Sequence, residues 1–197
     1  MNHKEVEMEE RAVQTVYFDK PGPANTDRTL KIAESRAKEL GIRTIIVATT
    51  EGDTGAKAAN RFKEFETVAV THATGFKEPN LQRLTPENRA AIEKNGGKIL
   101  TCTHAFAGIN RAIRNKTETY QVDEIIAFAL RTLGQGFKVS LEIAVMAADA
   151  GLVKVGEPCI AIAGTGKGAD TAVVLTPVNV QNFFDIRIHE ILCKPYL

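Results

Sequence analysis

The chain has 197 residues, which is enough for one domain with a sizeable hydrophobic core. Hydrophobic residues make up 44% of it and charged residues 25%, as in an ordinary globular protein, and the formal net charge is only +1. A charge this small provides no basic surface for nucleic acid or for an anionic membrane, so we expect neither as a partner.

The termini and the cysteines carry information about location. The first twelve residues are charged and lack the apolar core of a secretory signal, and no stretch approaches the ~18 apolar residues of a membrane span. The three cysteines, Cys102, Cys159 and Cys193, are odd in number and form no C-x-x-C pair. This usage argues against disulfides and thiolate zinc sites, and we expect a cytoplasmic protein.

Strand and helix patterns alternate along the chain, each recognised by its hydrophobic period. In chain order the sequence predicts a helix (25–41), a strand (44–50), a helix (56–65), a strand (67–73), a helix (86–95), a strand (98–105), three helices (106–116, 121–134 and 137–151) and two strands (158–164 and 171–178).

This alternation predicts a three-layer α/β/α fold with a mostly parallel sheet. No composition break divides the chain, so we expect a single domain over residues 1–197 with a strand-like extension at 183–197. That apolar tail indicates either a subunit contact in a homo-oligomer or the covering of a sheet edge. Ligands of such folds bind beyond the carboxyl ends of the strands, where the strand order reverses. The loops that follow the predicted strands are therefore the candidate site.

The loop after the first strand runs through Thr49, Thr50, Glu51, Gly52, Asp53, Thr54 and Gly55 into a helix. Unpaired amide groups and the positive end of the dipole make a helix start favourable for an anion. The simpler alternative is that Thr54 caps the helix and Gly52 makes the turn. Glu51 and Asp53 argue against a phosphate unless their side chains point away.

A glycine-rich loop follows the fourth strand, with Gly164, Thr165, Gly166, Lys167 and Gly168. It is neither a dinucleotide fingerprint, because Asp170 begins a strand rather than a helix, nor a P-loop, because Lys167 precedes the last glycine. It can form a nest of backbone amides for an anion, with Lys167 as a nearby cation. The alternative is a simple hairpin connection.

The loops after the second and third strands resemble each other. The first contains His72, Gly75 and Phe76, and the second contains His104, Ala105 and Phe106. If the strands are neighbours, the histidines and rings face one crevice and can hold a planar heterocycle. Core aromatics with capping histidines are the alternative. A metal site with Cys102 lacks a nearby acidic ligand, so we expect no metal.

Lys138 and Glu142 are one helical turn apart in the apolar helix 137–151. Charges on a buried helix are costly unless they are paired. Either the two form an ion pair, or one of them points into the crevice as an acid, a base or an anion contact.

With these loops considered together, residues 25–178 resemble the C-terminal α/β domain of pyruvate kinase. The turn after the first strand shares Thr50, Gly52 and Thr54 with the effector-phosphate loop of that domain, although it lacks the serine and adds Glu51 and Asp53. The segment from Gly164 to Thr171 resembles its second glycine-rich loop. Pyruvate kinase chemistry lies in a large barrel domain that this sequence does not supply, so we do not expect that activity.

More specifically, nearly the whole chain resembles stand-alone, mostly archaeal proteins of this fold, through the segments KPGPANT, THATGF, THAFAG, GQGFKVSLEIAVMAADAG, GADTAVVL and FFDIRIHEILCKP. The resemblance implies five strands in the order 3-2-1-4-5, the last antiparallel. The loops after strands one and four are then neighbours. Relatives of this kind have been associated with bound flavin mononucleotide, and no reaction is established for them.

We therefore expect a crevice that binds a phosphorylated heterocycle, namely flavin mononucleotide. Its phosphate is expected at Thr49, Gly52, Thr54 and Gly55, and its rings toward His72, Phe76, His104 and Phe106. Lys138 and Lys167 would balance the negative charge. A flavin-dependent redox reaction is one expectation, and a non-catalytic sensor of a phosphorylated metabolite is the alternative. A flavin-free hydrolase or lyase using His104 or Glu142 is a third.

Overall fold

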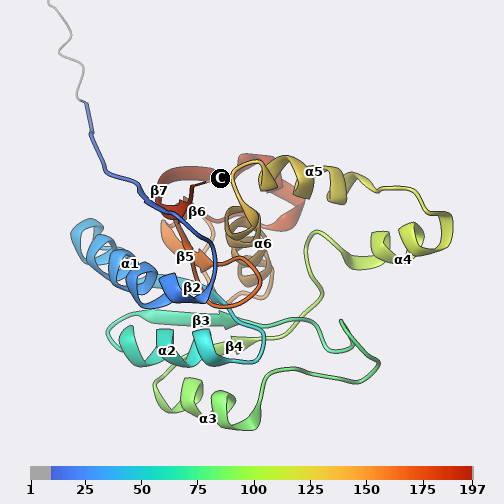
Figure 1. Ribbon diagram of the computed structural model, residues 1–197, viewed down its shortest axis with the longest axis horizontal. Coiled ribbons are helices and arrows are strands. Elements are labelled where there is room, and N and C mark those ends of the chain that lie inside the picture. Colours follow the sequence, from blue (N-terminus) through green and yellow to red (C-terminus); the bar gives the residue numbers. More distant parts are fainter. Residues whose placement is uncertain (1–9, 197) are drawn as a thin grey trace, which may run out of the picture.

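A seven-stranded sheet forms the centre of the computed structural model, which describes residues 10–196 (Figure 1). The strand order is β1-β7-β6-β5-β2-β3-β4, and β6 alone runs antiparallel to its neighbours. The strands are β1 (Val16–Phe18), β2 (Thr44–Ala48), β3 (Glu66–Val70), β4 (Lys98–Leu100), β5 (Cys159–Ala163), β6 (Thr171–Thr176) and β7 (Arg187–Pro195).

Six α-helices and two short 3-10 helices complete the described part of the chain. The α-helices are α1 (Thr26–Leu40), α2 (Asp53–Arg61), α3 (Pro86–Lys94), α4 (Gly108–Thr117), α5 (Val122–Arg131) and α6 (Gln135–Asp149). The 3-10 helices are η1 (Pro23–Asn25) and η2 (Val180–Asp185). None of the helices in residues 10–196 has the length and apolarity that a membrane span requires.

The expected topology is confirmed for the five predicted strands, but the strand count is wrong. Strands β4-β3-β2-β5-β6 are adjacent in the predicted order, with β6 antiparallel. The sheet continues beyond them because the tail forms β7, which pairs with β6, and the three-residue β1 pairs with β7. The tail thus covers a sheet edge, whereas β1 is too short to show a period in the sequence.

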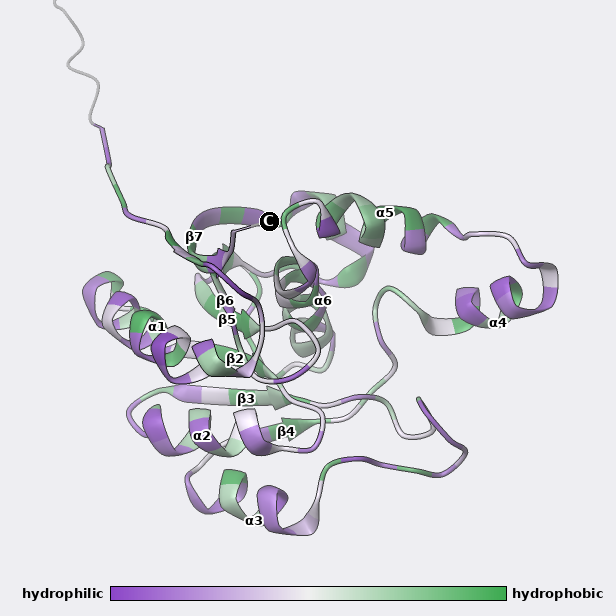
Figure 2. Cartoon of the chain, viewed as in Figure 1, coloured by the Kyte–Doolittle hydropathy of each residue, from purple (hydrophilic) through white to green (hydrophobic). Residues whose placement is uncertain are grey.

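Alternate residues of the central strands β2, β3, β5 and β6 enter two separate cores. In β2, Ile45 and Val47 pack toward α1 and α2, and Ile46 packs toward α6. Nearly every side chain of α6 is buried, since this helix lies against β2, β5 and β6 (Figure 2). This three-layer arrangement leaves the ends of the strands, rather than the faces of the sheet, open to ligands.

Helices α4 and α5 expose several of their apolar side chains. Figure 1 shows α4 lying away from the sheet, and none of its residues is buried. Its predicted apolar spacing is present, but Ile109 is 79% exposed. Helix α5 contacts α6 and is largely hydrophobic (Figure 2), yet its Phe128 side chain is 49% exposed.

The sheet positions of the cysteines predict unequal thiol reactivity. Burial raises the pKa of Cys159 in β5 to about 12 and that of Cys193 in β7 to about 11. Cys102 is only partly buried. Because a thiolate is the reactive form, a thiol reagent should modify Cys102 first in the native protein and reach the other two only after unfolding. Mass spectrometry of the labelled peptides measures this, and rapid native labelling of Cys193 would contradict the position of β7.

Candidate functional site

The reversal point of the sheet lies between β2 and β5. Strand β2 pairs with β3 on one side and with β5 on the other, and all three are parallel. Helices α2 and α6 pack on opposite faces of these strands. Consequently the turn after β2 and the glycine loop after β5 leave the sheet side by side, as the sequence predicts for a ligand crevice.

The turn after β2 is held in place by contacts with α3. The Glu51 carbonyl accepts hydrogen bonds from the Thr85 amide (3.1 Å) and the Asn88 side chain (2.9 Å). Gly52 has a φ of 107°, and a Cβ there would lie 2.4 Å from the Cβ of Asn88. Glycine is therefore required at this position by both conformation and space.

The start of α2 has amide groups available for a ligand. The Gly55 amide donates to Thr49 Oγ1 (3.2 Å), and the first helical bond runs from Ala56 to the Gly52 carbonyl. The N-cap residue is Gly52, which has no side chain, and the side-chain oxygen on the Gly55 amide comes from Thr49, so Thr54 does not have the capping role considered above. The amides of Asp53 and Thr54 thus remain at the positive end of the dipole.

Buried Asp170 holds the glycine loop in position. Its carboxylate accepts hydrogen bonds from the amides of Gly22 (2.9 Å) and Thr165 (3.1 Å) and from the Thr171 hydroxyl (2.8 Å). The loop is also packed tightly on the N-terminal segment, because a Cβ on Gly168 would lie 2.5 Å from Pro23 Cα. The loop is therefore a hairpin connection that is fixed at one wall of a cleft.

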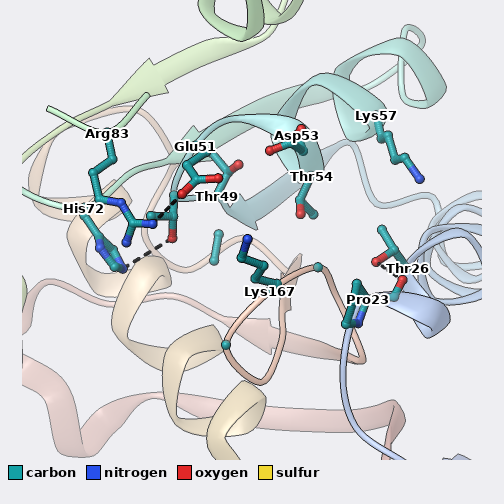
Figure 3. A pocket seen from close by; sticks show the side chains of 14 residues that line it. Pro23, Thr26, Thr49, Glu51, Asp53, Thr54, Lys57, His72, Arg83 and Lys167 are labelled. Atoms are coloured by element: carbon teal, nitrogen blue, oxygen red, sulfur yellow. Dashed lines mark hydrogen bonds and ion pairs between the residues drawn. The ribbon is translucent and has the colours of Figure 1, made fainter. Parts of the chain in front are cut away.

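These two loops line a cleft of about 620 Å³, which we call the first cleft (Figure 3). Such a volume is typical of small-molecule sites. In Figure 3, Lys167 extends from the glycine loop toward the turn after β2. The residues that line the first cleft are Pro23, Thr26, Ala48, Thr49, Thr50, Glu51, Asp53, Thr54, Lys57, His72, Arg83, Gly166, Lys167 and Gly168.

The first cleft has three cationic side chains and two carboxylates. Arg83 forms an ion pair with Glu51 (2.5 Å), and this hydrogen bond, followed by the charge of Lys167, lowers the pKa of that carboxyl. The Glu51 charge is thus compensated within the protein. Within residues 10–196, Lys167 has no carboxylate within ion-pair distance, so its charge is available to an anion.

His72 separates the first cleft from a second one. Its Nε2 lies 3.5 Å from Thr50 Oγ1, and its ring is 4.5 Å from the Phe76 ring and 5.2 Å from the His104 ring. Phe76 and His104 are stacked with centroids 4.8 Å apart. These three rings form one cluster, whereas Phe106 packs against Phe183 instead, and in the described chain only His72 of the cluster lines the first cleft.

The second cleft has a volume of about 520 Å³ and lies among α4, α5, α6 and the ends of β3 and β4. It contains several residues that we expected in one crevice with the turn after β2 and the glycine loop, namely Phe76, His104, Phe106, Lys138 and Glu142. These residues therefore lie in a cleft that shares only His72, among the described lining residues, with the first one.

Lys138 and Glu142 form the predicted buried ion pair at the base of the second cleft. Glu142 Oε1 also accepts a hydrogen bond from the Phe106 amide (3.1 Å). Burial lowers the pKa of Lys138, while the adjacent Glu142 opposes this effect. Each charge is therefore compensated by the other, and both side chains still line the second cleft.

The remaining predicted residues shape the loops without lining either cleft. They are Gly52, Gly55, Gly75, Ala105, Gly164, Thr165 and Asp170. Sequence reasoning missed Arg83 in the first cleft, as well as Arg111 and Arg131 in the second. Arg83 lies in the irregular segment between β3 and α3, where no periodic pattern marks a side chain that folds back on Glu51.

A comparison with protein-family models matches residues 27–175 to the model described as pyruvate kinase, alpha/beta domain. Among solved structures, pyruvate kinase from Cryptosporidium parvum is similar, with 15% identity, a TM-score of 0.40, and coverage of 77% of this chain and 22% of that one. The ADP complex of Cryptosporidium parvum pyruvate kinase has 15% identity, a TM-score of 0.36, and coverage of 84% and 23%. This chain thus spans less than a quarter of those pyruvate kinases.

Removing the Asp170 carboxylate should destabilise the fold, because three donors would lose their buried acceptor. We expect Asp170→Ala to lower the free energy of unfolding by about 3 kcal/mol. Exposed Asp185 on η2 is the matched control, and Asp185→Ala should change stability by less than ~0.5 kcal/mol. Urea denaturation measures both, and equal effects would contradict the role of Asp170.

The burial of His72 predicts that the folded protein loses stability in acid. Burial, and then the nearby His104 and Arg83, lowers the pKa of His72 from an ordinary 6.5 to about 4. Between these values the unfolded chain binds a proton that the folded chain does not, so stability falls as the pH falls through this range. His72→Asn removes this proton uptake and should flatten the decline measured by urea denaturation at several pH values. An unchanged slope would contradict the burial of the imidazole.

Proposed function

This chain belongs to the pyruvate kinase alpha/beta domain family, and on that premise we propose that it binds a phosphorylated small molecule in the first cleft. We further propose that flavin mononucleotide is this molecule. The observation that carries the proposal is the meeting of the start of α2 with the glycine loop at one cleft (Figure 3).

The phosphate end of the ligand is supported by three kinds of donor. The amides of Asp53 and Thr54 lie at the start of α2, and the Thr54 side chain lines the cleft. Lys167 adds a full positive charge from the opposite wall. A helix start and a lysine together form a suitable environment for a phosphate group.

The ring end of the ligand is assigned to the His72 side of the first cleft. The low pKa of His72, about 4, keeps its imidazole neutral at physiological pH. A neutral imidazole can exchange hydrogen bonds with a heterocycle and contact it with its ring face. A bound flavin would supply redox chemistry, and the residues of this chain would hold and orient it.

A non-catalytic sensor of a phosphorylated metabolite is the second candidate. It is favoured by the composition of the first cleft, where His72 provides the only aromatic ring among the described lining residues. A metabolite without a heterocycle needs no further ring. The two candidates therefore differ in whether the ligand requires its flat ring system or only its phosphate.

Calorimetric titration with flavin mononucleotide, riboflavin and a panel of sugar phosphates separates these candidates. We expect flavin mononucleotide to bind, and riboflavin to bind far more weakly because it lacks the phosphate. At a hundredfold excess over Kd, the ligand should stabilise the protein by about 2.7 kcal/mol. A yellow colour in the freshly purified protein would support the same ligand.

Lys167→Met should weaken flavin mononucleotide binding by about tenfold through loss of a charge-assisted contact. The control is Lys63→Met, since Lys63 is exposed beyond the far end of α2 and lines neither cleft. Tight binding of a sugar phosphate, without binding of flavin mononucleotide, would favour the sensor over the flavin protein. If no phosphorylated compound binds, or if both variants behave alike, the proposed function is wrong.

A further inference from the structure

The second cleft is a separate space with a different chemical character from the first. In the described residues His72 alone lines both clefts. Aromatic rings and arginines surround the second cleft, whereas backbone turns and threonines surround the first. An inference about its ligand therefore does not depend on what occupies the first cleft.

Positive charge exceeds negative charge around the second cleft. Four cations (Arg111, Arg114, Arg131, Lys138) and two carboxylates (Glu124, Glu142) line it. Both carboxylates are already paired, Glu124 with Arg114 (3.1 Å) and Glu142 with Lys138.

Two guanidinium groups are left for an external anion. Across residues 10–196, neither Arg111 nor Arg131 has a carboxylate within ion-pair distance. Arg131 instead donates to the Gln135 side-chain oxygen (2.7 Å). Helix α6 begins at Gln135, which lines the cleft, so the positive end of its dipole adds to the same field.

Each free guanidinium lies over an aromatic ring that also faces solvent. The Arg111 guanidinium carbon is 4.9 Å from the Phe76 ring centre, and that of Arg131 is 5.5 Å from the Phe128 ring centre. Phe76 and Phe128 are 41% and 49% exposed. Exposed rings beside stacked guanidiniums offer a flat apolar contact and a directed positive charge at the same place.

We propose that the second cleft binds a planar aromatic or conjugated molecule that carries a carboxylate. Arg111 and Arg131 provide the charge that recognises the carboxylate, and Phe76 and Phe128 provide contacts for the ring. A guanidinium pairs well with the two oxygens of a carboxylate. Lys138 already compensates the charge of Glu142, so the two free guanidiniums are the charges that a ligand carboxylate would meet in this cleft.

Benzoate is a suitable probe because it contains only the proposed ring and charge. Calorimetry with the full chain should detect benzoate binding at millimolar concentration, with weaker binding of cyclohexanecarboxylate, which is not planar, and of benzamide, which is not charged. Arg111→Gln and Arg131→Gln should each weaken benzoate binding by about tenfold. Both side chains are exposed, so these variants should fold normally.

Two control variants separate this site from the first cleft. Arg89→Gln on α3 removes an exposed arginine that lines neither cleft, and it should leave benzoate binding unchanged. Lys167→Met should also leave it unchanged, although it weakens the phosphorylated ligand of the first cleft. The proposed function and this inference can therefore fail independently.

Three results would overturn the inference. The first is the absence of benzoate binding at millimolar concentration, and the second is equal binding of benzoate, cyclohexanecarboxylate and benzamide. The third is unchanged benzoate binding in both Arg111→Gln and Arg131→Gln, with melting temperatures like that of the parent protein. If an arginine variant fails to fold, Phe128→Leu provides the alternative test through loss of the ring contact, and unchanged binding there rejects the site equally.

Discussion

The position of β2 between β3 and β5 is the constraint on which the rest of the site depends. The helix that follows β2, α2, packs on one face of the sheet, and the helix that precedes β5, α6, packs on the other. The turns that follow β2 and β5 therefore leave the sheet side by side and line one cleft. Lys167 and the start of α2 become neighbours because of this topology, although more than 100 residues separate them in the chain.

Backbone amides and buried polar contacts, more than side-chain charge, determine the shape of the first cleft. Hydrogen bonds to Asp170 hold the glycine loop in place, and a hydrogen bond from Asn88 holds the turn after β2. Arg83 compensates the charge of Glu51 through an ion pair. A polar group that is already ordered does not lose further freedom when a ligand binds, so such preorganisation favours affinity. The second cleft differs because exposed helices α4 and α5 contribute much of its lining.

The sequence contains enough information to predict the five central strands and the adjacency of the two turns that line the first cleft. Apolar runs such as CIAIA mark fully buried strands, and their order follows from the family resemblance. The extension of the sheet by β7 and β1 could not be predicted in the same way. Strand β7 alternates clearly but its partner is set by tertiary contacts, and β1 has three residues. Likewise, the division at His72 results from ring packing between loops, which no local pattern encodes.

The most direct test of the anion site is a nitrogen–proton correlation spectrum of the protein titrated with inorganic phosphate. We predict that the amide signals of Asp53 and Thr54 and those of residues 166–168 shift together, with one common affinity, while signals from α4 and α5 stay in place. Phosphate-dependent shifts in only one of the two loops, or none in either, would contradict the claim that they form a single binding site.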